Sequence, residues 1–216
     1  MNKNKILVNV ASSTYALEGF INLDDHIFLS FMWLYRRFKF LIPVKYHNMF
    51  LSFLKAQEIG VLIKHDCRKP LPFKSNSVDH ILCSHFLEHV FPDEVDQILK
   101  DYKRVLKVGG TLHIILPDIQ FQVNNYLKKK KDGDSFAADE FIANTYLTRK
   151  KNYQSFKLHL LNLFNKTGHK HHWMYDKESI SRRIQDANFL ILPKNNTPSE
   201  SFRKNDNSVH VIAVKQ

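Results

Sequence analysis

Cysteine is scarce in this chain of 216 residues, which contains only Cys67 and Cys83. Neither belongs to a CxxC pair, so the spacing supports neither a disulfide framework nor a zinc knuckle. Free thiols persist in reducing compartments, and we therefore expect a cytoplasmic protein.

Long apolar runs are also missing. The apolar stretch after the basic N-terminus stops at Asn9, so we expect no secretory signal. A second run, 27–35, is followed by three basic residues before residue 40, and it is shorter than the roughly 20 residues of a spanning helix. The favoured interpretation is a buried helix that covers one face of a sheet. The alternative, for residues 27–39, is a helix on a membrane surface with its arginines at the headgroups.

Acidic residues are outnumbered, since 21 Asp and Glu face 32 Lys and Arg and give a formal net charge of +11. Such a charge favours an anionic partner: nucleic acid, an acidic membrane surface or an acidic glycan. The alternative is a lysine-rich composition without bearing on partners. The hydrophobic content of 44% is ordinary for a folded chain. The length favours one domain over residues 1–216.

Short apolar segments alternate with helical patterns along the chain. Residues from Val95 to Leu106 repeat at three- and four-residue spacing and predict a helix over 92–106, which Gly109 and Gly110 would end. Asp176 predicts the N-cap of a helix that reaches Ala187. Helical cover segments are expected at about 26–58 and 120–165, with a charged loop at 128–134. The expected strands are 6–10, 20–23, 61–64, 80–83, 111–116, 189–192 and 209–214.

This alternation predicts an α/β fold with a mostly parallel sheet and helices on both faces. Such sheets bind ligands at the carboxyl ends of their strands. The turn after the first strand contains small residues but no glycine. If Ala11 or Ser13 adopts a positive φ there, each costs about 1–2 kcal/mol. The residues at the strand ends are Val10, Ala11, Ser12, Ser13, Asp24, Asp66, Cys67, Ser84 and His85.

The segment 66–117 carries a specific likeness. It combines Asp66-Cys67 after the third strand, Leu87-Glu88-His89 after the fourth, and Gly109-Gly110 before the fifth. It resembles the class I S-adenosylmethionine (SAM)-dependent methyltransferases of the type 11-like group, and most of all the small methyltransferases of glycan and lipopolysaccharide biosynthesis. The resemblance implies a Rossmann-like seven-stranded fold, SAM as cofactor, and methyl transfer to a small-molecule or saccharide acceptor, with a lipid-linked glycan as one alternative. The basic net charge favours an anionic acceptor.

The resemblance also implies roles for individual residues. Asp24 would accept both ribose hydroxyls, and Asp66 would accept the adenine amino group beside the Cys67 backbone N–H. The turn Val10–Ser13 would approach the methionine half of SAM, with Ser84 nearby. The alternative for each aspartate is a turn residue at a strand end.

Histidines supply the candidate bases. His85 and His89 follow the fourth strand, and a histidine has a pKa suited to removing a proton from an oxygen nucleophile. Glu88 would orient one of them; the alternative is that Glu88 and His89 only hold the turn. His169 is a further candidate base in a histidine-rich loop, which otherwise is a surface loop. The histidines of that loop lack the spacing of zinc proteases, so no metal is expected.

Two other functions stay open at this point. The turn without glycines is compatible with a degenerate, catalytically inactive methyltransferase-like binding protein. The charge is compatible with a nucleic-acid methyltransferase, although no Asn-Pro-Pro-Tyr-type sequence follows the fourth strand.

Overall fold

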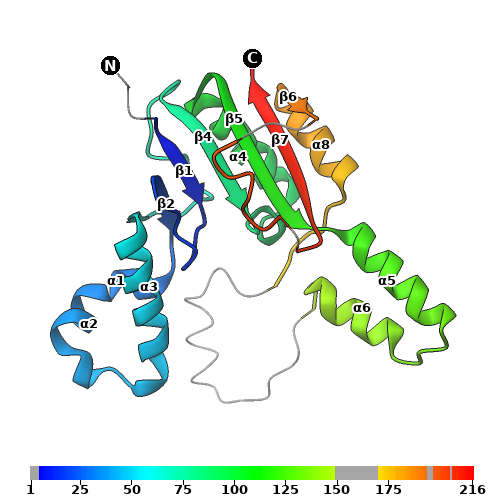
Figure 1. Ribbon diagram of the computed structural model, residues 1–216, viewed down its shortest axis with the longest axis horizontal. Coiled ribbons are helices and arrows are strands. Elements are labelled where there is room, and N and C mark those ends of the chain that lie inside the picture. The colour runs from blue at the N-terminus through cyan, green and yellow to red at the C-terminus, as the bar shows by residue number, and fades with distance from the viewer. Residues whose placement is uncertain (1–4, 149–169, 194–196, 205) are drawn as a thin grey trace.

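The computed structural model describes residues 5–148, 170–193, 197–204 and 206–216. One seven-stranded sheet runs through it in the order β3-β2-β1-β4-β5-β7-β6 (Figure 1). Strands β1 to β5 pair in parallel, and β7 is antiparallel to both β5 and β6. The strands are β1 (Leu7–Val10), β2 (Phe20–Asp24), β3 (Val61–Lys64), β4 (Val78–Ser84), β5 (Leu106–Pro117), β6 (Phe189–Leu192) and β7 (Ser208–Lys215). The predicted α/β fold and all seven predicted strands are confirmed.

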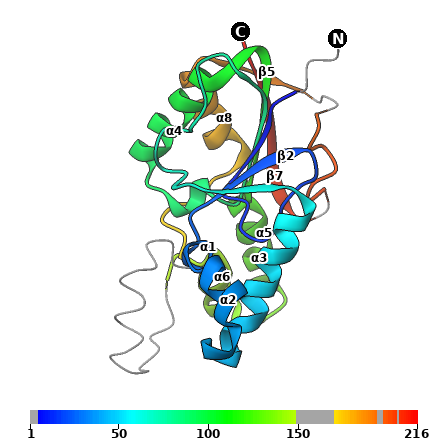
Figure 2. The same ribbon diagram turned by 90° about the vertical axis from the view of Figure 1, so that its left-hand side faces the viewer.

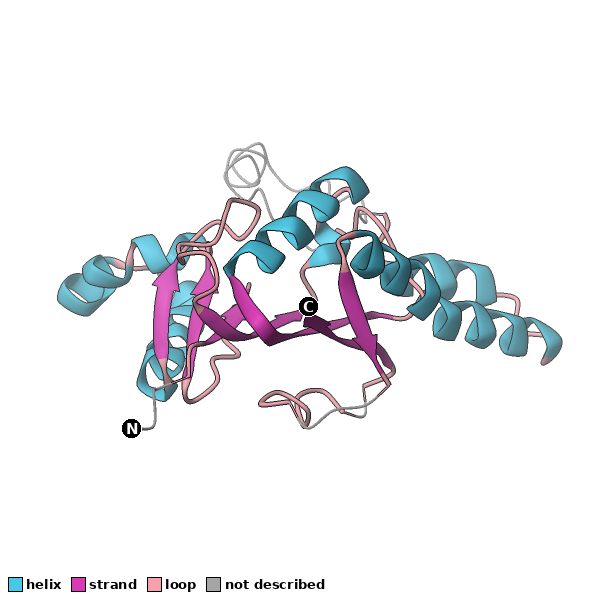
Figure 3. Ribbon diagram, turned by 90° about the horizontal axis from the view of Figure 1, so that it is seen from above, coloured by secondary structure: helices cyan, strands magenta, loops and turns pink. Residues whose placement is uncertain are grey.

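The helices of the described residues come in three groups: α1 to α3 after β2, α4 between β4 and β5, and α5, α6 and α8 after β5. α4 and α8 lie on one face of the sheet (Figure 3). The other face packs Phe20 and Leu82 against Leu17 and Phe202. The helices are α1 (Ile27–Ser30), α2 (Met32–Phe38), α3 (His47–Ile59), α4 (Pro92–Val105), α5 (Ile119–Lys131), α6 (Ala137–Thr145) and α8 (Lys177–Asp186), with 3-10 turns at Lys39–Leu41, Val44–Tyr46 and Leu87–His89 (η3).

Helix α4 is the main element over the sheet. Pro92 stands in its first turn together with Asp93 and Glu94, whose carboxylates suit the helix N-terminus. Its apolar face, from Val95 to Val105, is buried in the main core. The helix ends at Val105, earlier than predicted, because Leu106 already pairs with Val78 in the sheet. Gly109, with a φ of 78°, therefore lies within β5 and does not end the helix.

Two buried asparagines hold the short connection between β1 and β2. The Asn9 amide donates to Asn22 Oδ1 at 2.9 Å and to the Tyr15 carbonyl at 3.0 Å. Asn22 also accepts from the Leu17 N–H and donates to the Phe20 and Val61 carbonyls. This network fixes β1 to β2 and β3, and it fixes the turn that leaves β1.

The segment 26–58 is mostly helical, as predicted, but the run 27–35 does not form the single sheet-covering helix that was the favoured interpretation. Helix α2 buries Met32 and Tyr35 against Phe50 and Phe53 of α3 instead of lying flat on the sheet. Trp33, between the buried residues, is 65% exposed. The two views of Figures 1 and 2 place α1 and α2 beyond the carboxyl end of β2.

The segment 120–165 begins with α5 and α6, which pack against each other and project from the sheet edge (Figure 1). None of the side chains of α5 is buried. Lys128 to Lys131 form the last turn of α5 and not the predicted loop. The predicted helix near the C-terminus is present as α8, with Asp176 as N-cap accepting from the Ser179 N–H at 2.8 Å.

Candidate active site

The turn after β1 contains two residues that a positive φ would strain, and both of them have one. Ala11 and Ser13 have φ values of 52° and 49°, in the left-handed region. The Ser12 N–H donates to the Leu23 carbonyl at 2.9 Å, and the Ser13 N–H donates to Asp24 Oδ2 at 2.8 Å. The turn therefore follows the end of β2 closely, and the left-handed conformation of Ser13 accompanies a hydrogen bond from its backbone amide to the Asp24 carboxylate.

Asp24 lies at the end of β2 with one backbone donor on each oxygen. Besides the Ser13 amide, the His26 N–H donates to Oδ1 at 2.7 Å. Burial raises the pKa of this carboxyl, while the two amide hydrogen bonds oppose that rise. Each carboxylate oxygen has a further lone pair, so Asp24 retains the capacity to accept from two hydroxyl donors.

A cavity of about 110 Å³ opens at the ends of β1 and β4. Within the described part of the chain, the buried hydroxyls of Ser12 and Ser84 have no hydrogen-bond partner. Both residues line the cavity, so their hydroxyl groups are available as hydrogen-bond donors to a polar ligand. Its lining residues are Asn9, Ala11, Ser12, Ser13, Tyr15, Ser84, His85, Phe202 and Arg203.

The C-terminal loop limits this cavity. The Arg203 guanidinium lies 5.3 Å from the Tyr15 ring centre and pairs with Asp206 at 3.2 Å. Ligand pockets commonly measure about 300 Å³ or more, so this cavity of about 110 Å³ is smaller than a nucleoside-sized ligand needs. Sequence reasoning missed Tyr15, Phe202 and Arg203. For Phe202 and Arg203, nothing in the sequence between β6 and β7 indicates that these residues reach the end of β1.

Asp66 and Cys67 follow β3 as predicted, but their side chains are engaged. Arg68 grips both oxygens of Asp66, at 2.9 and 2.8 Å, and this hydrogen bonding lowers the pKa of the carboxyl. The Cys67 thiol is buried, with Sγ 3.9 Å from the Leu23 carbonyl oxygen, and burial raises its pKa. A cavity of about 330 Å³ runs from Cys67 and Arg68 to Tyr102 of α4. The adenine role of Asp66 stays a prediction, and it requires a lone pair that Arg68 leaves open.

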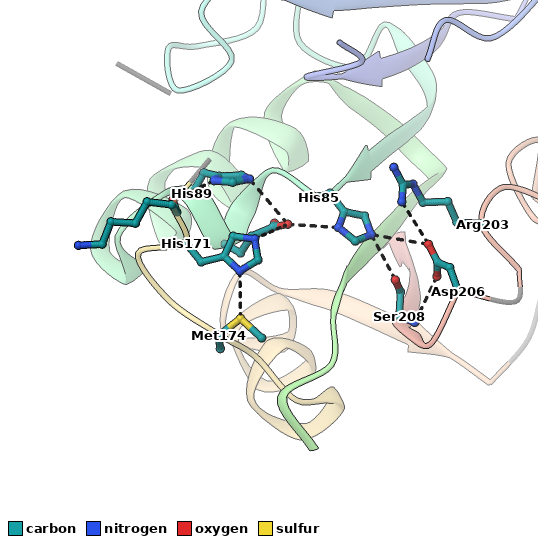
Figure 4. A network of polar contacts seen from close by, with 9 residues as sticks. His85, His89, His171, Met174, Arg203, Asp206 and Ser208 are labelled. Carbon is teal, nitrogen blue, oxygen red and sulfur yellow. Dashed lines mark hydrogen bonds and ion pairs between the residues drawn. The ribbon is translucent and has the colours of Figure 1, made fainter. Parts of the chain in front are cut away.

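His85 lies between two acidic side chains at the end of β4. Its φ of 51° is again left-handed. Nδ1 lies 3.4 Å from Glu88 Oε1, and Nε2 lies 3.2 Å from Ser208 Oγ and 3.8 Å from Asp206 Oδ2 (Figure 4). His85 lines the cavity beside Ser84, so the structure places this candidate base at the predicted ligand edge.

His89 lies across Glu88 from His85. Its Nε2 is 4.0 Å from Glu88 Oε1, and its Nδ1 is 3.0 Å from the Lys170 carbonyl oxygen. His171, from the histidine-rich segment, is also 4.0 Å from the same carboxylate oxygen. Glu88 thus contacts both predicted histidines and a third one that spacing did not single out. His169, the third candidate base, lies outside the described residues.

The comparisons with known proteins agree with this architecture. A family described as a methyltransferase domain matches residues 29–114. No curated protein matches the sequence.

Solved structures share the fold over nearly the whole chain. A protein from Pyrococcus horikoshii OT3 has a TM-score of 0.54 at 13% identity, covering 100% of this chain and 84% of its own. A SAM-dependent methyltransferase from Aquifex aeolicus has a TM-score of 0.50 at 11% identity, covering 99% and 84%. A chain in the Haloferax volcanii complex between the Trm112 methyltransferase activator and a methyltransferase has a TM-score of 0.52 at 12% identity. The match covers 99% of this chain and 83% of that one. At these identities the likeness concerns the fold, which is that of class I methyltransferases.

Proposed function

We propose, from the premise that this chain carries a methyltransferase domain on the class I fold, that it transfers a methyl group from SAM to an oxygen of a saccharide or another small-molecule acceptor. The observation that carries the proposal is the turn after β1, where Ser13 is held in a left-handed conformation with its amide on Asp24. When bound, SAM would supply an electrophilic methyl carbon on a sulfonium, so that the C–S bond breaks and a neutral sulfide leaves as the acceptor oxygen bonds to that carbon in line.

The residues of the turn fit such a cofactor. Ser12 and Ser84 offer unpartnered hydroxyls at the cavity, where the polar end of an amino acid would bind. Asp24 retains lone pairs for a pair of ribose hydroxyls. Asp66 and Cys67 complete the proposed pocket on the far side of β2, with Arg68 shaping it.

His85 is the proposed base on the acceptor side. Its ring lines the cavity and has an acceptor near each nitrogen: Glu88 at Nδ1 and Ser208 with Asp206 at Nε2. A ring with Nδ1–H toward Glu88 has its lone pair at Nε2, which can take a proton from an acceptor hydroxyl. Glu88 and Asp206 would then stabilise the imidazolium through their negative charge.

Exposed apolar and basic side chains in the segment 33–45 support an acceptor at a membrane. Phe40 is 78% exposed and Val44 81%, and Trp33 lies on the same segment. Arg36, Arg37, Lys39 and Lys45 are exposed among these apolar side chains. Aromatic residues that reach the acyl boundary and cations at the headgroups are what binds a protein to an anionic bilayer. No helix in the described ranges has the length and apolarity to span a bilayer. We therefore propose peripheral attachment and a lipid-linked, anionic acceptor.

Turnover tests the enzymatic part of the proposal. Transfer of a labelled methyl group from SAM is measured with lipid-linked and free saccharide acceptors, with duplex DNA and RNA alongside. His85→Ala should reduce kcat by about 100-fold or more, as expected for a lost general base, and should leave SAM affinity unchanged. Unchanged turnover in this variant removes His85 from the mechanism. SAM binding without turnover on any acceptor favours the inactive binding protein, and turnover on nucleic acid alone favours that class of substrate.

Vesicle sedimentation tests the membrane part. The chain should bind phosphatidylglycerol vesicles and not phosphatidylcholine vesicles, with binding that weakens as salt rises. Phe40→Ser should weaken binding several-fold. Trp173→Ser is the matched control, because Trp173 is also exposed, at 47%, but lies before α8. Equal loss in both variants, or equal binding to both vesicles, contradicts the proposal.

A further inference from the structure

Glu88 poses a problem of charge and hydrogen bonding. Its side chain is 1% exposed, and neither carboxylate oxygen has a hydrogen-bond partner among the described residues. His85 Nδ1 lies 3.4 Å from Oε1 without forming a hydrogen bond. A buried carboxylate that lacks hydrogen bonds is costly, and native structures normally pair such a group with a donor or a cation. Its backbone carbonyl, in contrast, is satisfied by the N–H groups of His172 and Trp173.

Two further histidines beside Glu88, His89 and His171, have ring orientations that their other contacts fix. His89 Nδ1 lies 3.0 Å from the Lys170 carbonyl oxygen, which only accepts, so Nδ1 carries the hydrogen. His171 Nδ1 lies 3.3 Å from the Met174 sulfur, which also only accepts. In a neutral ring the lone pair is then on Nε2. Both Nε2 atoms are 4.0 Å from Glu88 Oε1 (Figure 4). Three electron-rich atoms therefore face one another.

We propose that Glu88, His89 and His171 bind a divalent transition-metal ion of the zinc class. The three donor atoms lie within 4.8 Å of one another. With metal–ligand bonds of about 2.0–2.1 Å, donors in a tetrahedral site are about 3.4 Å apart, so small side-chain rotations close the set. Two histidines and one glutamate form a known zinc ligand set with an open fourth position.

The surroundings match what such ligands need. Metal-bound histidines usually donate their other N–H to a backbone carbonyl or a similar acceptor, which fixes the ring. The Lys170 carbonyl does this for His89, and the Met174 sulfur does it for His171. The ligands come from η3 and from the segment before α8, so the ion would also join these two parts of the chain.

The site extends the proposed function without depending on it. His85 Nδ1 lies 3.4 Å from Glu88 Oε1, so the ion would lie on the acceptor side, next to the cavity and away from Asp24. His89, as a ligand, would not act as the base, which leaves His85 for that role. The open position would take water or an acceptor oxygen. Metal binding is measured without SAM, so its failure leaves the proposed methyl transfer standing.

Zinc titration of the chelator-treated full chain tests the site. We expect one zinc per chain by elemental analysis after dialysis and a rise in Tm with zinc. Cobalt as a spectroscopic substitute should give the strong visible absorption of a four-coordinate site, and zinc should displace it. No stoichiometric zinc, or a cobalt spectrum of a hydrated six-coordinate ion, overturns the proposal without any variant having to fold.

Paired variants then assign the ligands. His171→Ala and Glu88→Gln should each weaken zinc binding by at least about 100-fold. This loss is larger than the one usually caused by substituting a residue that contacts a ligand and not the metal. His172→Ala is the matched control, because the His172 ring packs on the Phe91 ring with centroids 4.5 Å apart. Its contact with Glu88 is made by the backbone N–H, which alanine keeps, so this variant should retain full affinity. Circular dichroism confirms folding of each variant. Equal loss in His171→Ala and His172→Ala, or none in Glu88→Gln, contradicts the assignment.

Discussion

The strain in the turn after β1 predicts that a glycine at position 13 stabilises the folded chain. Ser13 has a φ of 49°, which costs a residue with a Cβ about 1–2 kcal/mol. Ser13→Gly removes that cost and adds about 0.5–1 kcal/mol of backbone entropy lost on folding. The net effect should be a stabilisation of about 0.5–1 kcal/mol. The hydrogen bond to Asp24 is made by the backbone amide, so it survives the substitution.

Thr14→Gly is the matched control. Thr14 is the next residue in the same turn and does not have a positive φ, so it should lose about 1 kcal/mol from entropy alone. Urea unfolding at equal m-values measures both free energies of unfolding. If Ser13→Gly lowers the stability as much as Thr14→Gly does, the left-handed turn and the strain argument are wrong.

Two further predictions concern stability. Asn22→Ala removes the amide that bridges β1, β2 and β3 and leaves buried backbone groups unpaired, so urea unfolding should show a loss of about 3 kcal/mol; a loss under 1 kcal/mol contradicts the network. Burial lowers the pKa of His80 to about 4 and of His113 to about 3, whereas an unfolded histidine has a pKa near 6.5. At pH values between these, the unfolded chain binds more protons than the folded chain. Stability should therefore fall as pH drops from 7 to 5, by about 2 kcal/mol for each histidine; equal unfolding free energies at the two pH values contradict this.

The sheet was predictable because each strand is a local apolar run, and alternation with helices fixes a parallel order. The boundary between α4 and β5 was not, because the pattern of Leu106 suits a helix equally well. Its pairing with Val78 decides the matter, and the Lys107–Asp79 ion pair at 2.7 Å adds to it. Both depend on residues far away in the sequence.

The candidate site was predictable to the extent that it sits at strand ends. Asp24, Ser84 and His85 follow parallel strands, which bring them to one edge of the sheet. Arg203 and His171 were not predictable as members of the site. Their positions depend on how two loops fold back over β1 and η3.

Calorimetric titration of the chain with SAM tests the central claim most directly. The account predicts one site per chain, weakened about 10- to 100-fold in Asp24→Asn, as expected for lost hydrogen bonds to a charged group. Asp25→Asn is the matched control, because Asp25 is adjacent to Asp24 in sequence and its side chain is 44% exposed. This variant should bind SAM as the unaltered chain does. No binding heat at millimolar SAM, or equal affinity in Asp24→Asn and the unaltered chain, would contradict a cofactor pocket built on the Ser13–Asp24 contact.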